Sequence, residues 1–117
     1  MDFELSKEQK DIQKAARRFA KGEFDRELAL ELEEKHEFPT EIWKKASEDG
    51  FIGLHYPEEY GGSGYGVMEN TLVVEEFCRR DSGIGAALML VDFASENVLR
   101  YGTREQKERY LPPVAEG

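Results

Sequence analysis

Apolar residues recur along most of this chain at intervals of three and four, and strict alternation of apolar and polar residues is nearly absent. The first apolar stripe consists of Ile12, Ala15, Ala16 and Phe19. Such spacing places side chains on one face of an α-helix, whereas a strand requires a period of two. The sequence therefore predicts an all-α fold of about six helices, an up-and-down-like helical bundle, in one domain over residues 1–117.

Capping residues indicate where these helices begin. Ser6 with Gln9, and Thr103 with Gln106, fit capping boxes that would open the first and last helices. Asp25 is a plausible cap for the second helix. Pro39 is predicted in the first turn of the third helix, and Gly50 at its end. A fourth helix is predicted over Val67–Arg80 and a fifth over Ile84–Tyr101. The sixth helix should kink or stop at Pro112 and Pro113.

The segment Phe51–Gly66 holds five of the chain's 11 glycines. Glycine at this density indicates backbone that turns sharply or takes positive φ, so we predict a Gly-rich crossover loop between two helices. Gly62, Gly64 and Gly66 lack the spacing of a dinucleotide-binding fingerprint, and no P-loop Lys-Ser or Lys-Thr pair follows them. A structural crossover is therefore favoured over a phosphate cradle.

The fifth predicted helix is the most apolar part of the chain. Between Ile84 and Ala94 only Gly85 and Asp92 are not apolar, and a helix that is apolar all round belongs in the centre of a protein. Asp92 is either an acid at the edge of an apolar binding pocket or a carboxylate on a wet edge or paired with Arg or Lys. We expect the second arrangement, since structural ion pairs commonly place acids this way.

Charge and composition exclude several classes of partner. The chain has 16 basic and 25 acidic residues, a net charge of −9, which would repel the phosphates of nucleic acid. The longest apolar stretch, Ile84–Val91, is too short to span a bilayer, and we expect no membrane span. The N-terminus lacks the pattern of a secretory signal, and the single Cys78 cannot form an internal disulfide. These features indicate a cytoplasmic, reducing location.

No catalytic constellation or metal site can be assembled from the remaining candidates. His36 and His55 lie far apart without metal-ligand spacing, so surface or loop positions are expected. Cys78 occupies an apolar helical position and is predicted to be a buried, inert thiol. The side chains of adjacent residues diverge by about 100° on a helix, so Glu75 and Glu76 cannot work as a paired acid and base on one face. We expect both to be solvated or capping residues.

Four segments, taken in order, resemble the N-terminal helical domain of the acyl-CoA dehydrogenase family. The third segment contains Pro57-Glu58-Glu59-Tyr60-Gly61-Gly62-Ser63-Gly64, which is similar to the family's best-known N-terminal motif. The four segments are Leu5–Gln9, Phe38–Ala46, Gly50–Gly64 and Tyr101–Pro112. They are spread over nearly the whole chain, from Leu5 to Pro112.

The resemblance implies a parent enzyme with this helical domain, a β-domain and a C-terminal four-helix bundle. Such parents use FAD to form α,β-unsaturated acyl-CoA, usually pass electrons to an electron-transfer flavoprotein, and are commonly homo-oligomers, in the cytoplasm or the mitochondrial matrix. The family's flavin-contacting segments and catalytic glutamate would lie outside these residues, so none here inherits a catalytic or FAD-binding role. By alignment on Ser82-Gly83, the pocket-facing, substrate-binding positions would be Gly85, Met89 and Phe93, with Gly85 leaving room for the acyl chain.

Two functions therefore remain. In the first, the chain is the N-terminal domain of an acyl-CoA dehydrogenase that forms a wall of the acyl pocket and is inert alone, with no FAD expected on this chain by itself. In the second, it is a stand-alone helical protein-interaction module with the same fold. The all-round apolarity of the fifth predicted helix favours the first, because other domains of a large protein would cover that surface.

Overall fold

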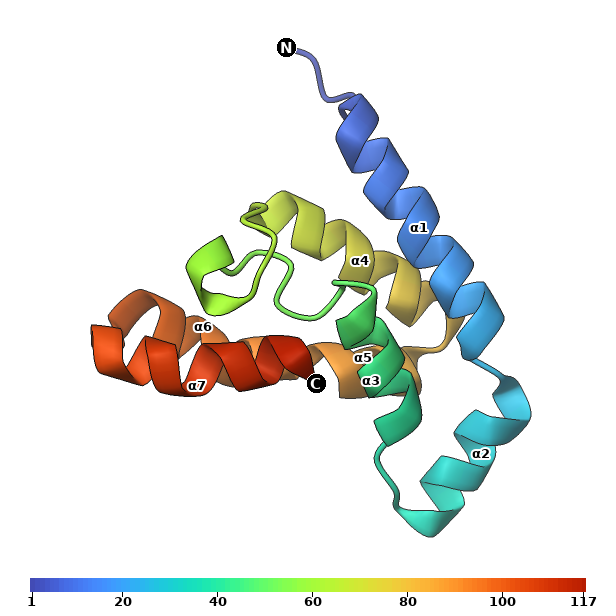
Figure 1. Ribbon diagram of the computed structural model, residues 1–117. Helices are drawn as coiled ribbons and strands as arrows, with labels where there is room; N and C mark the ends of the chain where they lie inside the picture. The colour runs from blue at the N-terminus through green and yellow to red at the C-terminus, as the bar shows by residue number, and fades with distance from the viewer.

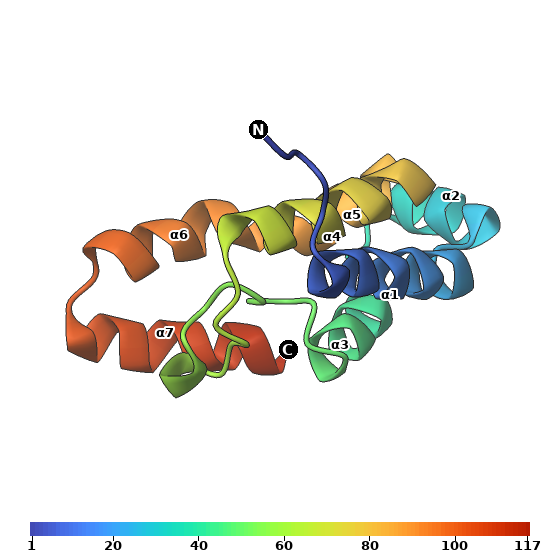
Figure 2. The same cartoon turned by 90° about the horizontal axis from the view of Figure 1, so that it is seen from above.

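The computed structural model describes the whole chain, residues 1–117, and all of its regular secondary structure is helical (Figure 1). The elements are α1 (Lys7–Glu23), α2 (Arg26–Lys35), α3 (Thr40–Glu48), the short 3₁₀ helix η1 (Glu58–Tyr60), α4 (Val67–Arg80), α5 (Ser82–Met89), α6 (Val91–Tyr101) and α7 (Arg104–Glu116). The prediction of an all-α domain is confirmed. The molecule is flat, with extents of 41 × 38 × 21 Å, and Figure 2 shows α4, α5 and α6 in one layer with α3 and α7 in the other.

The predicted capping residues begin the helices as expected. The Gln9 backbone N–H donates to Ser6 Oγ at 3.1 Å, and the Ser6 N–H donates to Gln9 Oε1 at 2.9 Å. Thr103 and Gln106 form the same reciprocal pair at 3.2 and 2.8 Å. Asp25 caps α2 by accepting from the Leu28 N–H at 3.0 Å. These bonds satisfy N–H groups that a helix start leaves without a backbone partner.

The predicted fifth helix is two helices that meet at Leu90. The backbone bond from the Phe93 N–H to the Leu90 carbonyl spans three residues, which tightens the chain into a turn. The turn lets α5 pack on α4 while α6 packs on α7. A single straight helix could not reach both partners, and for that reason the prediction of one helix was wrong.

Of the kink or stop predicted at the two prolines of the last helix, the stop does not occur. α7 continues through Pro112 and Pro113 to Glu116. Leu111 and Ala115 on either side of them are buried in a small cluster with Tyr56 and Tyr60. Burial of these apolar side chains offsets the backbone hydrogen bonds that proline cannot donate.

The main core lies where α1 crosses α4 and meets the first part of the crossover loop. Ala16 and Ala20 on α1 are fully buried, and their small side chains let α1 approach α4 closely. Four phenylalanine rings fill the space beside them, with centroids 5.2–6.2 Å apart. They are Phe19, Phe24, Phe51 and Phe77.

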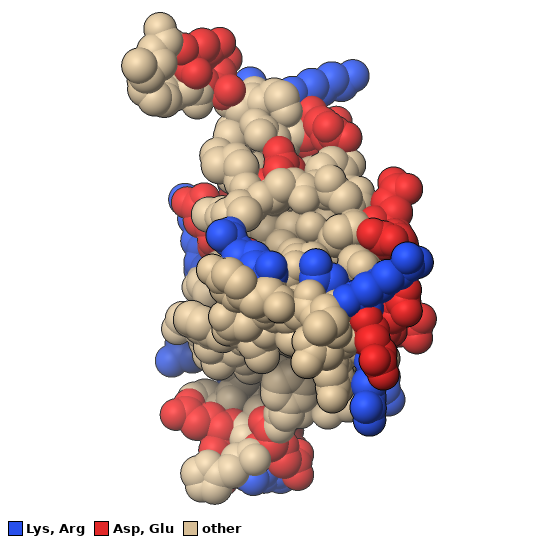
Figure 3. Space-filling view, turned by 90° about the vertical axis from the view of Figure 1, so that its left-hand side faces the viewer, with Lys and Arg blue, Asp and Glu red and all other residues tan.

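Charged side chains lie on the outside of the domain. Figure 3 shows the end of the molecule that carries the turn between α6 and α7, where Lys and Arg side chains cross the middle of the face and Asp and Glu side chains gather mainly along one edge. Pairs four residues apart join the two signs there, including Arg104 Nε and Glu108 Oε1 at 2.8 Å. No helix combines the length and apolarity needed to cross a membrane.

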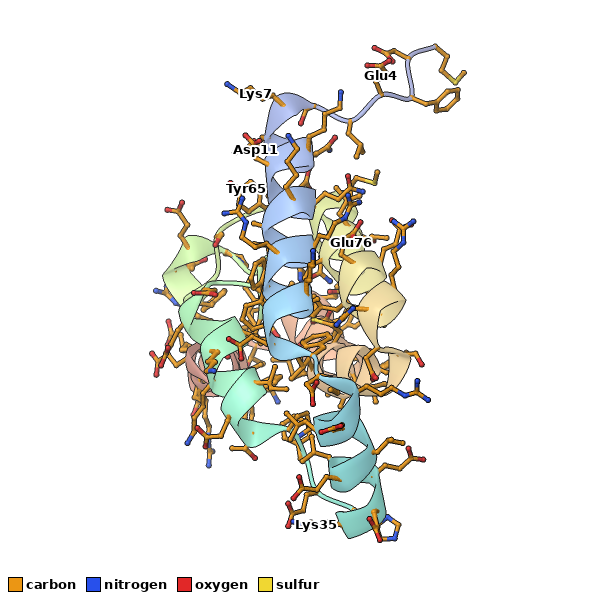
Figure 4. All side chains as sticks on the ribbon, turned by 90° about the vertical axis from the view of Figure 1, so that its right-hand side faces the viewer. Glu4, Lys7, Asp11, Lys35, Tyr65 and Glu76 are labelled. Atoms are coloured by element: carbon orange, nitrogen blue, oxygen red, sulfur yellow. The ribbon has the colours of Figure 1, made fainter.

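Polar pairs fasten α1 to α4 along the edges of their apolar contact. Gln9 Nε2 donates to Glu69 Oε1 of α4 at 2.8 Å, and Tyr65 Oη, from the crossover loop just before α4, donates to Glu8 Oε1 at 2.9 Å. Farther along, Arg17 donates from Nε and Nη2 to the two oxygens of Glu76 at 2.9 and 2.8 Å. Figure 4 shows Glu76 on α4 beside α1. The Glu76 side chain is only 1% exposed, so the expectation that Glu76 is solvated or a cap was wrong.

Replacement of Glu76 by glutamine should therefore give a pH-dependent loss of stability. The hydrogen bonds from Arg17 hold the pKa of the Glu76 carboxyl below its usual value, despite an opposing effect of burial. A carboxyl with a lowered folded-state pKa contributes stability above its unfolded-state pKa and loses it as pH falls through the folded-state pKa. We expect Glu76→Gln to lower the free energy of unfolding by about 1–2 kcal/mol at neutral pH.

Urea denaturation at a series of pH values checks this prediction. The difference between the wild type and Glu76→Gln should narrow as pH falls below the ordinary carboxyl range. The exposed neighbour Glu75 is the matched control, and Glu75→Gln should leave the unfolding midpoint nearly unchanged. A difference for Glu76→Gln that stays constant from pH 7 to acid would contradict the ion-pair explanation.

Candidate functional site

An open apolar groove runs between α4, α5 and α6, with a volume of about 590 Å³. Its apolar lining comes from all three helices, and a polar group of side chains closes one part of it. The principal apolar residues are Val67 and Val74 of α4, Met89 of α5, Leu90 at the bend, and Phe93 of α6. The polar residues include His55, Asn70, Asp92 and Glu96.

Two of the three residues predicted to bind substrate lie in this groove. Met89 is 6% exposed and forms part of its wall, whereas Phe93 is 76% exposed at its rim. Leu90 is also exposed beside them, so the bend between α5 and α6 presents bulky apolar side chains to the outside. Bulky apolar side chains around an open groove are suited to holding an apolar chain.

Gly85 has a different role from the one predicted for it. A Cβ at this position would lie 2.7 Å from the Cys78 backbone nitrogen and 2.7 Å from the Phe77 carbonyl carbon. The space beside Gly85 is therefore filled by the α4 backbone and not by room for a ligand. The glycine allows α5 to pack directly on α4, and this contact positions Met89 one turn farther along α5.

His55 comes from the crossover loop and lies beneath α6. Its side chain is only 6% exposed, and Nε2 lies 3.2 Å from Glu96 Oε2. Glu96 also accepts a hydrogen bond from Arg100 one turn along α6, and Arg100 is the main cause of the lowered pKa of the Glu96 carboxyl. Of the surface or loop position predicted for His55, the loop position is correct, but no local pattern in the sequence indicates that Glu96 lies against it.

Asp92 lies at the edge of the groove. It is neither solvated on a wet edge nor paired with Arg or Lys, so the arrangement that we expected for it is wrong. Its partner is an amide, because Asn70 Nδ2 donates to Asp92 Oδ2 at 2.8 Å. Burial raises the pKa of the Asp92 carboxyl, and the bond from Asn70 and the nearby His55 oppose that effect. The alternative interpretation, an acid at the edge of an apolar pocket, describes its position.

Replacement of Asp92 by asparagine should stabilise the domain at neutral pH. A carboxyl whose folded-state pKa is raised binds its proton more tightly when folded, so it destabilises the fold as pH rises above its unfolded-state pKa. Asparagine keeps an oxygen for the Asn70 amide and carries no charge. We expect Asp92→Asn to melt a few degrees higher than the wild type at pH 7, with the gap closing toward acid pH.

Thermal unfolding followed by circular dichroism from acid to neutral pH provides the measurement. Asp11→Asn on the exposed face of α1 serves as the control for a lost negative charge, and its melting temperature should stay close to that of the wild type. If Asp92→Asn melts below the wild type at neutral pH, the carboxylate has a stabilising partner and the argument from burial is wrong.

The other candidate residues from the sequence, Cys78 and His36, show no arrangement that indicates a catalytic or metal-binding role. Cys78 is half-buried in the groove lining, not fully buried, and burial raises the pKa of its thiol, which keeps it protonated and unreactive. His36 is exposed just beyond α2 with φ of 55°, in the left-handed region. No group of three or more His, Cys, Asp or Glu side chains is placed to hold a metal ion.

The glycine-rich part of the loop uses its amides to hold its own shape. The Gly62 and Gly64 N–H groups donate to the carbonyls of Pro57 and Tyr56 at 3.3 and 2.9 Å, and the Gly66 N–H donates to Glu69 Oε2 at 2.9 Å. Amides that are already bonded cannot hold phosphate oxygens. The loop therefore fits a structural crossover, and it does not fit the pyrophosphate of a flavin or nicotinamide dinucleotide.

The fold and groove define a class of protein, an all-helical domain with an open apolar groove between three of its helices. Comparison with known proteins agrees with this class. Residues 6–117 match the family described as acyl-CoA dehydrogenase, N-terminal domain. The chain belongs to this family.

Three similar proteins illustrate the relationship. The chain is 40% identical over 117 residues to acryloyl-CoA reductase (NADH) of Anaerotignum propionicum, covering all of this chain and 29% of that protein. A chain from the structure of the electron transferring flavoprotein of Acidaminococcus fermentans superposes with a TM-score of 0.85 at 37% identity, covering 100% of this chain and 31% of that one. Acyl-CoA dehydrogenase of Bacillus anthracis, complexed with FAD, gives a TM-score of 0.83 at 35% identity and covers 97% and 19%. The chain thus spans less than a third of each.

Proposed function

We propose that this domain forms one wall of the acyl pocket in an FAD-dependent acyl-CoA dehydrogenase that produces α,β-unsaturated acyl-CoA. The observation that carries the proposal is the groove between α4, α5 and α6, where Met89 and Phe93 present apolar bulk. A saturated acyl chain needs apolar walls of this kind. The family membership of the chain and its similarity to a dehydrogenase complexed with FAD support the same proposal.

The residues of this chain would bind and orient the acyl group. Met89 would set the depth of the pocket, and Phe93 would cover the acyl chain at the rim. Gly85 would allow α5 to pack closely against α4. FAD, where bound, supplies the acceptor for the hydride that leaves the β carbon. No residue here is assigned to the flavin, because the amides of the glycine loop are already bonded.

The domain is proposed to be inert by itself and to act within a larger assembly. The groove is open, and Leu90 and Phe93 are exposed beside it, so a second layer of protein would be needed to exclude water from the acyl chain. An electron-transfer flavoprotein is the proposed electron acceptor, and similarity to a chain in such a structure supports it. A homo-oligomer is the proposed assembly.

The experiment compares the 117-residue chain with the complete protein that carries it. The complete protein should bind FAD and reduce an artificial electron acceptor when given butyryl-CoA or longer thioesters, whereas the 117-residue chain should show neither flavin absorbance nor turnover. Turnover by the isolated chain would contradict inertness. A complete protein that binds no flavin and oxidises no thioester would favour the interaction-module alternative.

A further inference from the structure

A second hollow, of about 350 Å³, lies between α1 and α4 and is lined entirely by charged side chains. Arg17 and Lys21 come from α1, four residues apart and therefore on one face of that helix. Glu76, Arg79 and Arg80 come from α4. Four of these five side chains are positive, although the chain as a whole has a net charge of −9. The hollow is therefore a basic site on an acidic protein.

This basic hollow and the apolar groove lie on opposite sides of α4. Val74 and Cys78 line the groove, whereas Glu76, between them in the sequence, lines the hollow. Two positions along a helix correspond to a rotation of about 200°, so the Glu76 side chain points away from the groove and toward α1 (Figure 4). A molecule in the basic hollow would thus be a second ligand, separate from an acyl chain in the groove.

One of the four cations satisfies the single acid of the hollow. Arg17 donates from two nitrogens to the two oxygens of Glu76, at 2.9 and 2.8 Å. Arg79 Nη1 lies 3.8 Å from the same carboxylate, and the Arg79 side chain is 69% exposed. Lys21 and Arg80 form no ion pair, and Arg80 Nε donates to a backbone carbonyl just past α1 at 3.3 Å. Four positive charges and one negative charge leave a surplus of three.

The ends of the two helices account for part of this surplus. Lys21 lies in the last turn of α1, and Arg79 and Arg80 lie in the last turn of α4. A helix C-terminus has a partial negative charge of roughly one half, so two of them offset about one of the three positive charges. A surplus of about two positive charges remains, which is more than the helix ends require.

A surplus of this size matches a phosphate monoester. Such a group has a charge of about −1.5 to −2 at neutral pH, whereas a carboxylate has a charge of −1. Guanidinium groups bind phosphate oxygens through paired N–H donors, and those of Arg79 have no hydrogen-bond partner in the chain. No apolar or aromatic side chain lines the hollow to anchor a partner protein, so a small phosphorylated molecule fits it better.

We propose that the basic hollow binds the phosphate monoester group of a small molecule. Lys21, Arg79 and Arg80 hold the phosphate, while Arg17 stays bonded to Glu76. Because the phosphate contacts both α1 and α4, its binding should raise the melting temperature of the protein. The site goes beyond the proposed function, and its test needs no thioester and no turnover.

Isothermal titration calorimetry on the complete protein at low ionic strength tests the site, with phenyl phosphate as the probe. Benzoate, which has the same ring and a single carboxylate, is the matched control ligand. We expect one phenyl phosphate per chain with a dissociation constant of about 1 mM or below, and at least about tenfold weaker binding of benzoate. The affinity for phenyl phosphate should fall as salt is added, because salt screens exposed charges.

Removal of two cations that the fold does not use makes the test specific. The double variant Lys21→Gln/Arg79→Gln should weaken phenyl phosphate binding by about tenfold or more, since it removes two of the three surplus charges. Both side chains are exposed and neither makes a hydrogen bond, so the variant should fold. Arg18→Gln is the matched control, because Arg18 is exposed on α1 and does not line the hollow. Its affinity should stay within about twofold of the wild type.

Several results would overturn this inference. The absence of saturable phenyl phosphate binding would do so directly. Equal binding of benzoate and phenyl phosphate would mean that the hollow attracts negative charge without selecting phosphate. Binding that the double variant does not weaken would lie elsewhere in the protein. A phosphoserine peptide that binds at least about tenfold more tightly than phenyl phosphate would assign the site to a partner protein and not to a small molecule.

Discussion

Replacing Gly85 by alanine is expected to lower the free energy of unfolding by about 2–3 kcal/mol. The added Cβ would lie 2.7 Å from two backbone atoms of α4 and 2.9 Å from a third, the Cα of Cys78. Backbone atoms cannot rotate away as a flexible side chain can, so α5 must move away from α4 and open a gap in the core around Phe77. Urea denaturation followed by circular dichroism measures the loss.

Gly22 provides a matched control for this substitution. Gly22 lies inside α1, and a Cβ there would meet nothing within 4 Å. Alanine is the better helix former by roughly 0.5–1 kcal/mol, so Gly22→Ala should stabilise the domain. The two substitutions are chemically identical and should have opposite signs. If Gly85→Ala left the urea midpoint unchanged, α5 would not be packed as tightly on α4 as the structure shows.

If this domain forms the acyl wall as proposed, truncation of Met89 to alanine should shift the chain-length preference of the complete protein toward longer acyl groups. The buried Met89 side chain closes part of the groove, and its removal would extend the space available to an acyl chain. Each extra methylene that fits an apolar pocket changes kcat/KM by about 10–200-fold, so the ratio of long-chain to short-chain kcat/KM should rise by at least about tenfold. Steady-state kinetics with a series of straight-chain thioesters measures the ratio.

Phe93→Ala tests the rim of the same wall. Because Phe93 is 76% exposed in this domain, its contribution depends on the protein that covers the groove, and we expect a smaller shift in the same direction. Leu30→Ala on α2 is the control, since Leu30 is exposed and does not line this groove. If selectivity is unmoved by both Met89→Ala and Phe93→Ala, these residues do not form the acyl wall.

Helix starts were predictable because they depend on neighbours in sequence. A capping box needs a Ser or Thr and a Gln three residues later, and both boxes form as the sequence indicates. Loop position was also predictable, since glycine density marks backbone that leaves the helical region. Gly53, Gly61 and Gly64 indeed take positive φ. The family resemblance added the groove residues Met89 and Phe93, which periodicity could not have singled out.

The polar side of the groove was not predictable, because its members are far apart in sequence. Glu96 lies 41 residues from His55, and Asp92 lies 22 residues from Asn70. The exposed Arg17 and the buried Glu76 that it contacts are 59 residues apart. No local pattern specifies such partners, and the sequence around an acidic residue is the same whether its side chain faces water or a cation on another helix.

The bend at Leu90 and the role of Gly85 show the same limit. Both residues lie in the apolar segment Ile84–Ala94, whose sequence predicts a single helix. Glycine has no side chain to indicate which face of that helix it occupies. Only the docking of α5 on α4 and of α6 on α7 determines where the chain must turn and which glycine must admit a neighbouring backbone.

The amino-acid sequence alone thus determined that the chain is helical, where most helices begin, where the crossover loop lies and which family motifs it carries, because these features arise from residues within a few positions of one another. The tertiary structure alone decided which acids are buried, which histidine meets them and where the apolar groove opens. Those outcomes depend on distant segments brought into contact, and the free energy of burial is set only once that contact exists.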